Sequence, residues 1–471
     1  MSLQSKAFVS HPKFAVVGHP NKGKSSIVAS LAMDDTVHIS NTPGTTTKKR
    51  SFPLMVDGKV LYELFDTPGF QRARAVLAWL KAQEKVSADE RHTVVEAFIE
   101  AHKHNPKFND EIELLTPIMQ GAGIIYVVDA SKPYGPEYET EMEILRWTGQ
   151  PSMALLNQID QSDYSSQWKR ALGHYFKMVR TYHPMQATLE EHLSILESMA
   201  QLKEEWIAPL KASIVCFEEA YTHKVEQSSH LMAQLLYQAL SLVEKKRLSN
   251  KEMTQEEKEA LTHSYKERLK TLELHTQEKI KHIWNHSHLE TEFSQLSLHN
   301  VDLFSQESAS IFGLSKKELL VTGVTSGAVT GAGIDLLFAG HTLLVGGVIG
   351  AVVGGVGAYL GFEELSEVKV LGRKLGDYTL SIGPMKNKNF PYILLGRIVW
   401  YTTKVMQHSH AKRHKVDFSM DVSFKERWLD EALQRKLEKY HKQFRSKKAL
   451  EPEALKAYAK MLDNTLKALV K

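Results

Sequence analysis

The chain has 471 residues, 42% of them hydrophobic and 24% charged, which is typical of a globular protein with two or three domains. Its single cysteine, Cys216, excludes an intrachain disulfide, and no secretory segment precedes the first predicted strand, so we expect an intracellular protein. The net charge of +4 is uneven, because 23 Lys and Arg stand against 13 Asp and Glu from Gly361 onward. This basic part favours an acidic partner, such as anionic lipid, nucleic acid or the acidic remainder of the chain.

A glycine-rich loop follows the first predicted strand, an apolar run over residues 14–17. Gly18, Gly23, Lys24 and Ser25 have the G-x-x-x-x-G-K-S spacing of a phosphate-binding loop. In such a loop the backbone amides surround a phosphate, the lysine reaches the terminal phosphates, and the serine hydroxyl can bind Mg²⁺. The helix that begins here directs its positive end at the same anion. The spacing therefore predicts a nucleoside triphosphate site.

Two further motifs follow in chain order. Residues 41–50 read NTPGTTTKKR, where a threonine hydroxyl could reach Mg²⁺; a Thr-rich turn is the alternative. Residues 61–70 predict a strand that ends in D-x-x-G. There, Asp66 would hold Mg²⁺ through water and the Gly69 amide would meet the terminal phosphate.

The next two predicted strands, at 123–131 and 153–160, are apolar enough to be buried on both faces of a sheet. The second ends in N-x-x-D, where Asp160 would accept the ring N–H and the exocyclic amine of guanine, which adenine cannot offer. Each motif is weak alone, but together they stand at the carboxyl ends of successive strands, where α/β sheets bind ligands. We predict an α/β domain with a central, mostly parallel sheet and helices on both faces.

These motifs resemble those of the TrmE–Era–EngA-like P-loop GTPases over residues 12–215. The loop GHPNKGKS is similar to their phosphate loop, PGTT to their first switch and DTPG to their second. Taken whole, the chain resembles a bacterial group that joins this GTPase to a C-terminal domain of unknown function. The resemblance implies GTP and GDP as ligands, Mg²⁺ as cofactor and hydrolysis of GTP.

The resemblance also implies roles for single residues. Ser25, Thr46 and Asp66 become the Mg²⁺ ligands, and Lys24, Thr46, Gly69 and Asn21 the catalytic residues. The implied nucleotide-binding residues are Gly18, Asn21, Lys22, Gly23, Lys24, Ser25, Ser26, Thr46, Asp66, Gly69, Asn157, Gln158 and Asp160.

Asn21 has two interpretations. Several relatives use this asparagine to bind a potassium ion that compensates charge in the transition state, which makes potassium-stimulated hydrolysis a hypothesis. The alternative is that Asn21 only caps the loop.

The sequence departs from the family pattern at two positions. Gln158 replaces the lysine whose stem packs over the base, which puts guanine affinity in doubt but leaves selection to Asp160. Phe70 follows D-x-x-G where some GTPases place a water-orienting glutamine, so we expect slow intrinsic turnover. Residues 72–116 are predicted to form a helical insertion, either a partner surface that moves with nucleotide state or a passive lid on the sheet.

The C-terminal half is predicted to be mainly helical, with a small α+β part. We assign residues 1–215 to the GTPase domain, 216–318 to a helical bundle or arm, 319–362 to a glycine-rich hairpin and 363–471 to a basic α+β and helical region. Within the last region, the β-branched and aromatic runs at 368–382 and 392–405 predict a few strands or a strand–helix mixture.

The glycine-rich hairpin carries glycines four residues apart in each half, which would let two helices approach closely. Residues 343–360 are 18 uncharged residues, near the lower limit for spanning a bilayer, whereas Asp335 makes the first half a poor span. Two interpretations stay open: a hairpin in or against a membrane, and two helices buried in a soluble core.

The main functional prediction is a nucleotide-dependent GTPase switch at the cytoplasmic face of the cell membrane, contacting anionic lipid through residues 319–362 and the basic C-terminus. One alternative is an Era-like ribosome or RNA assembly GTPase whose basic C-terminus binds RNA. Another is a membrane-remodelling or structural protein gated by GTP. A second copy of the chain, forming a homodimer, is a further expected partner.

Overall fold

The structure is a computed structural model. It describes residues 11–32, 50–56, 59–83, 86–248, 254–286, 302–314, 363–365, 369–370, 373–374, 378–408, 422–446 and 451–470. The chain divides into two compact units, Met1–Tyr221 with Gln407–His414 and Thr222–Met406 with Lys415–Lys471. The predicted domain borders at 215, 318 and 362 stay predictions.

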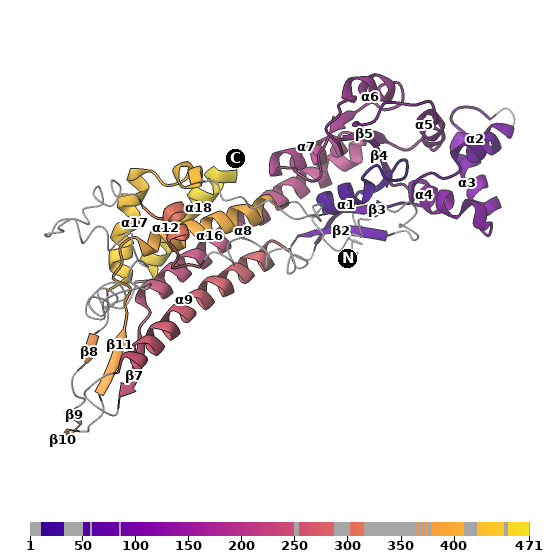
Figure 1. The fold of residues 1–471 in the computed structure, drawn as a ribbon. Helices are drawn as coiled ribbons and strands as arrows, with labels where there is room; N and C mark the ends of the chain where they lie inside the picture. The colour runs from indigo at the N-terminus through magenta and orange to yellow at the C-terminus, as the bar shows by residue number, and fades with distance from the viewer. Residues whose placement is uncertain are drawn as a thin grey trace, which may run out of the picture. The chain divides into compact units, whose positions relative to one another are not determined.

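The first unit is built on a six-stranded sheet in the order β2-β3-β1-β4-β5-β6 (Figure 1). All neighbouring strands are parallel except β2 and β3, which are consecutive in the chain and antiparallel. The strands are β1 (Lys13–Val17), β2 (Arg50–Val56), β3 (Lys59–Asp66), β4 (Gly123–Asp129), β5 (Ser152–Asn157) and β6 (Val179–Thr181). The prediction of a mostly parallel sheet is confirmed.

Helices cover both faces of this sheet, because successive side chains of a strand point to opposite faces. Along β1, Ala15 and Val17 join one buried apolar cluster, and Phe14 and Val16 join the other. The helices on the first face are α2 (Ala73–Ala82), α3 (Arg91–His102), α4 (Asn109–Met119), α5 (Glu137–Trp147) and α6 (Ser165–Leu172). Those on the second face are α1 (Lys24–Ala32), α7 (Leu189–Ala200) and the first part of α8 (Glu204–Ser241).

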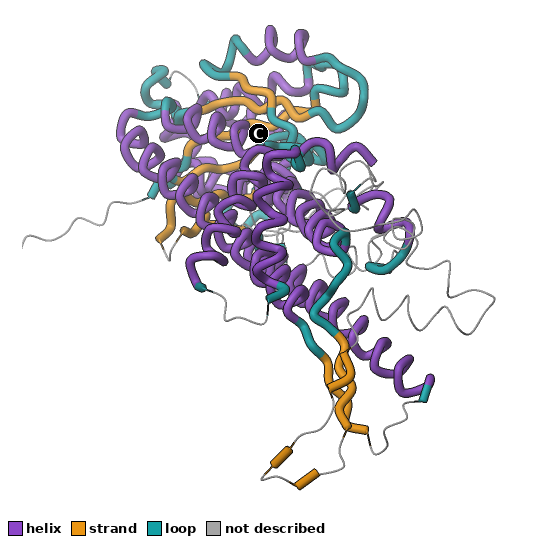
Figure 2. Tube along the Cα trace, turned by 90° about the vertical axis from the view of Figure 1, so that its left-hand side faces the viewer, coloured by secondary structure: helices purple, strands orange, loops and turns teal. Residues whose placement is uncertain are grey.

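The second unit is mainly helical, as predicted (Figure 2). Its small antiparallel sheet has the order β7-β11-β8, and β9 pairs with β10. The strands are β7 (Glu244–Leu248), β8 (Glu363–Leu365), β9 (Lys369–Val370), β10 (Arg373–Lys374) and β11 (Tyr378–Ile382). The helices, besides the end of α8, are α9 (Gln255–Ile283), α12 (Gln306–Phe312), α16 (Phe390–Gln407), α17 (Glu431–Phe444) and α18 (Pro452–Val470).

Helix α16 is the core helix of the second unit. Its β-branched and aromatic run left strands or a strand–helix mixture open, but the structure forms one continuous helix. Almost every side chain of α16 is buried, and a helix that is apolar all round belongs in a core. Its Arg397 donates from Nε to Glu273 Oε1 at 2.7 Å and from Nη2 to Oε2 at 3.2 Å. Each of these two buried charges, Arg397 on α16 and Glu273 on α9, thus has an oppositely charged partner in the apolar core.

The predicted glycine-rich hairpin at 319–362 lies outside the described residues. Among the helices that the structure describes, none has the length and apolar content needed to cross a bilayer.

Loss of Glu273 should destabilise the protein strongly. Glu273→Ala would leave the buried Arg397 without its carboxylate, at an expected cost of about 3–5 kcal/mol in the free energy of unfolding. Urea unfolding, monitored by circular dichroism, measures this change in the free energy of unfolding. The matched control is Glu431→Ala, which breaks an exposed pair with Arg435 and should cost less than about 1 kcal/mol. Equal effects of the two substitutions would contradict the assigned role of the buried pair.

Candidate nucleotide-binding site

The predicted phosphate loop joins β1 to α1 and turns tightly at the carboxyl end of the strand. Gly18, Asn21 and Gly23 have positive φ angles of 144°, 59° and 84°. A Cβ on Gly18 would lie 2.4 Å from the carbonyl oxygen of Val127 on the neighbouring strand β4, so only glycine allows this approach. Asparagine is one of the few other residues that adopt a left-handed conformation readily, as Asn21 does here.

Lys24, the first residue of α1, has a side chain that lies within the loop. It is 8% exposed, and its Nζ donates to the carbonyl oxygen of His19 at 3.1 Å. Burial lowers the pKa of Lys24 to about 8, while the negative charges of Asp66 and Glu141 limit that shift. The loop therefore holds a buried ammonium group close to two carboxylates.

Ser25 and Asp66 connect the phosphate loop to the end of β3. The Ser25 hydroxyl donates to Asp66 Oδ2 at 2.8 Å, and Asp66 is 2% exposed. These oxygens fit Mg²⁺, which takes few ligands from the protein while substrate phosphates and water supply the remaining ones. The described residues contain no cluster of three or more His, Cys, Asp or Glu side chains able to hold a metal ion. The third predicted ligand, Thr46, lies outside the described residues.

Gly69 lies directly against the phosphate loop. A Cβ at this position would be 2.6 Å from the backbone nitrogen of Pro20, so a larger residue would push the two segments apart. The chain before it is fixed by Thr67, whose buried hydroxyl donates to the carbonyl oxygen of Val16 at 2.8 Å. The D-x-x-G motif and the loop are thus in contact.

Asn157, at the end of β5, braces the other side of the loop. Its Nδ2 donates to the carbonyl oxygen of Lys22 at 3.1 Å, and a Cβ on Gly23 would lie 2.1 Å from the same nitrogen. Lys22 in turn lies 3.8 Å from Asp129 Oδ2, at the end of β4. Residues from three strands therefore converge on one loop.

The predicted base-reading residues lie in a more exposed segment. Asp160 has a 63% exposed side chain and forms an ion pair with Lys132 at 3.7 Å. Gln158, which replaces the family's lysine, donates from Nε2 to the carbonyl oxygen of Ser162 at 3.2 Å. The cation beside Asp160 therefore comes from the segment after β4, a contribution that the sequence analysis missed.

Glu141 in α5 is a second residue that the sequence analysis missed. It is 2% exposed, accepts a hydrogen bond from the Tyr126 hydroxyl at 2.8 Å and lies 2.8 Å from Nδ1 of His19 in the loop. Nothing in the local sequence of α5 distinguishes Glu141 from its acidic neighbours. Only its burial shows that it supports the loop.

The structure thus brings Lys24, Ser25, Asp66, Gly69 and Asn157 together at one edge of the sheet. Two other predicted residues differ in the exposure of their side chains. Ser26 is buried in the first turn of α1, and Asn21 has an exposed side chain.

Comparisons with known proteins agree with this arrangement. A family model described as "50S ribosome-binding GTPase" matches residues 13–158, and one described as "Domain of unknown function (DUF3482)" matches residues 169–466. The second match covers more than half of the chain.

Individual relatives match shorter parts. "GTPase Der" of Thermoanaerobacter sp. is 34% identical over 120 residues, which are 25% of this chain and 27% of the relative. "tRNA modification GTPase MnmE" of Mycoplasma mobile is 28% identical over 102 residues, 22% of this chain and 23% of the relative. The chain therefore spans about a quarter of the length of these relatives.

A solved structure, Aquifex aeolicus Era bound to GDP and AlF4⁻, shares 17% identity over 40% of this chain and 56% of that chain, with a TM-score of 0.27. A TM-score of that size supports no inference. From the matches of the family models, the chain belongs to the DUF3482 family and joins that domain to an N-terminal P-loop GTPase domain.

Proposed function

We propose that this protein binds guanine nucleotides and hydrolyses GTP to GDP and phosphate as a nucleotide-dependent switch. One observation carries the proposal: the Ser25 hydroxyl, the Asp66 carboxylate and the buried Lys24 ammonium converge at the end of β1. These are the groups that bind Mg²⁺ and the terminal phosphates of a nucleotide. The relatives named above are GTPases by name, which supports the same reaction here.

In the proposed mechanism, Lys24 leaves the carbonyl oxygen of His19 and binds the terminal phosphates. Ser25, Asp66 and Thr46 would hold Mg²⁺, which supplies positive charge that neutralises the phosphates. The Gly69 N–H binds the γ-phosphate, and Asp160 accepts the two guanine donors. Gly18 and Gly23 let the loop amides approach the phosphates.

Turnover without a partner should be slow. Phe70, which stands after D-x-x-G, is 2% exposed within an apolar cluster and can neither orient nor deprotonate water.

We propose that a potassium ion bound at Asn21 assists hydrolysis. The Asn21 side chain is exposed and its backbone is left-handed, which leaves the amide oxygen accessible. The competing interpretation of Asn21 as a loop cap predicts equal rates in potassium and sodium.

Guanine nucleotide binding is tested directly with fluorescent GTP, GDP and ATP. We expect GTP and GDP to bind at least about tenfold more tightly than ATP, because only guanine offers Asp160 two donors. Ser25→Asn should abolish Mg²⁺-dependent GTP binding, and phosphate release should be faster in potassium than in sodium. The control is Ser194→Asn on the exposed surface of α7, which should bind like the wild type. Equal affinity for ATP would overturn the assignment of guanine.

The buried Lys24 should make stability depend on pH. Its pKa of about 8 in the folded chain lies below the unfolded value near 10.5, so the unfolded chain binds more protons between these pH values. Lys24 therefore destabilises the nucleotide-free fold fully below pH 8, and this cost fades as the pH rises towards 10.5. Lys24→Met should raise the free energy of unfolding by up to about 3 kcal/mol at pH 7 and by almost nothing near pH 10.5.

Urea unfolding of both proteins across this pH range measures the difference. Lys81→Met, which removes an exposed lysine from α2, is the control and should show no such pH dependence. A Lys24→Met variant that is less stable than the wild type at every pH would contradict the assigned burial cost.

We further propose that the switch acts at an anionic membrane surface. Exposed basic residues of α17 support this, because Arg435, Lys436, Lys439 and Lys442 recur at helical spacing. The glycine-rich residues 319–362 would be the second contact, although they lie outside the described residues.

Vesicle sedimentation tests the membrane proposal. The full chain should sediment with phosphatidylserine–phosphatidylcholine vesicles and not with phosphatidylcholine alone. Reversing the charges of Lys436, Lys439 and Lys442 to Glu should weaken binding at least about tenfold, since each cation contributes near a charged surface. The same reversal at Lys81, Lys103 and Lys107 is the control. Salt-sensitive co-migration with ribosomes in place of vesicle binding would favour the RNA alternative.

A further inference from the structure

The segment that follows D-x-x-G is held by a carboxylate from a different helix. Glu111, in the first turn of α4, is 1% exposed. Its Oε1 accepts hydrogen bonds from the backbone N–H groups of Gln71 at 3.0 Å and Arg72 at 2.6 Å. The side chains of Gln71 and Arg72 are themselves exposed, so it is their backbone that Glu111 holds.

This contact completes the N-terminus of α2. The helix begins at Ala73, and its N-cap residue Arg72 makes no side-chain capping hydrogen bond. N–H groups at a helix start lack partners within the helix, and a carboxylate placed there is favoured by hydrogen bonding and by the helix dipole. Glu111 therefore gives the N–H of the N-cap residue Arg72, and that of Gln71 before it, a carboxylate partner from α4.

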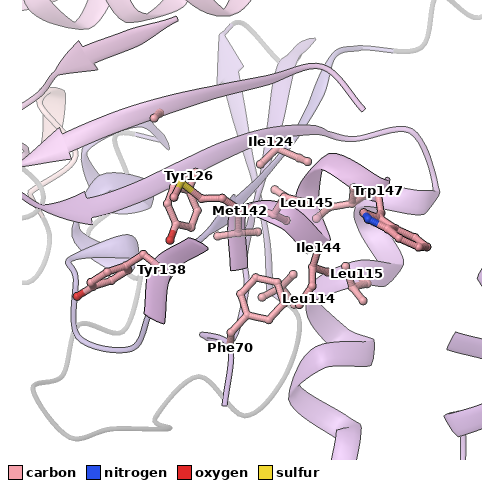
Figure 3. Close-up of a cluster of buried hydrophobic side chains, with 14 of the residues drawn as sticks. Phe70, Leu114, Leu115, Ile124, Tyr126, Tyr138, Met142, Ile144, Leu145 and Trp147 are labelled. Atoms are coloured by element: carbon pink, nitrogen blue, oxygen red, sulfur yellow. The ribbon is translucent and has the colours of Figure 1, made fainter. Parts of the chain in front are cut away.

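The same face of α4 also anchors Phe70. Leu114 and Leu115 follow Glu111 at helical spacings of three and four, and both belong to the buried cluster that contains Phe70. Figure 3 shows the Phe70 ring beside Leu114. One helix thus holds three consecutive residues after Gly69, by an apolar contact at Phe70 and polar contacts at Gln71 and Arg72.

We infer that Glu111 is a positioning residue for the γ-phosphate contact of Gly69, an inference that rests on the proposed function. Only residues 67–70 separate Gln71 from Asp66, which the Ser25 hydroxyl binds. Both ends of this short segment are held, and Gly69 lies against Pro20 of the loop. Glu111 therefore limits where the Gly69 N–H can go and keeps it at the position that a γ-phosphate requires.

Loss of Glu111 should weaken the binding of GTP but not that of GDP. Glu111→Ala should lower the affinity for a non-hydrolysable GTP analogue and the kcat of GTP hydrolysis at least about tenfold, since charge-assisted hydrogen bonds to both amides are lost. The affinity for GDP should stay within about twofold, because GDP has no γ-phosphate for Gly69 to meet. A merely structural role would weaken both nucleotides together.

Asp110→Ala is the matched control, because Asp110 carries the same charge in the same turn of α4. It should leave kcat and both affinities close to those of the wild type. Glu111→Gln tests the mechanism in a second way, because its amide oxygen keeps an acceptor of the same shape without the charge. We expect it to recover part of the lost kcat, and it decides the question if Glu111→Ala does not fold.

Hydrogen exchange gives a readout that needs no nucleotide. The amides of Gln71 and Arg72 should exchange at least about tenfold faster in Glu111→Ala than in the wild type, while those of α3 remain unchanged.

A wild-type chain that binds neither GTP nor GDP would contradict the proposed function itself. If the wild type binds both, an unchanged ratio of GTP-analogue to GDP affinity in Glu111→Ala and Glu111→Gln would overturn the role of Glu111 alone. A rise in kcat would also overturn it, because the contact would then oppose the active position of Gly69.

Discussion

The position of β1 between β3 and β4, parallel to both, is the constraint on which the candidate site depends. Parallel neighbours end at the same edge of a sheet, so segments distant in the chain meet there. Asp66 ends β3, Asp129 ends β4 and Asn157 ends β5, and each contacts the loop that leaves β1. Successive apolar side chains of β1 and β4 point to opposite faces, which requires helices on both faces. Of these helices, α5 contacts the loop through Glu141, and α4 contacts the segment after D-x-x-G through Glu111.

Burial of charge is the second theme of the site. Lys24, Asp66 and Glu141 are each less than 10% exposed, and a charge in such a place is stable only with partners. Lys24 donates to the backbone carbonyl oxygen of His19, which is a weaker partner than a phosphate. Burial lowers the pKa of the Lys24 ammonium to about 8.

The helical insertion between β3 and β4 belongs to the first unit. The helices between β3 and β4 pack into the apolar cluster on the sheet, and α4 also contacts the segment after D-x-x-G. The two interpretations of this insertion, a partner surface that moves with nucleotide state and a passive lid on the sheet, stay predictions. In the second unit, α16 is buried along almost its whole length, and its Arg397 pairs with the buried Glu273.

The amino-acid sequence by itself determined the phosphate loop and its strand, because their chemistry is local: eight consecutive residues carry the spacing, and four apolar residues precede them. It also placed Asp66 at the end of a strand, since buried strands and turns are readable from composition, whereas the strand predicted to reach Asp160 ends at Asn157. Glu111, Glu141 and Lys132 were not predictable, because an acidic or basic residue in an amphipathic helix or turn resembles any other until packing selects one. The form of α16 also depended on tertiary structure, since a fully buried helix and a buried strand share the same apolar composition.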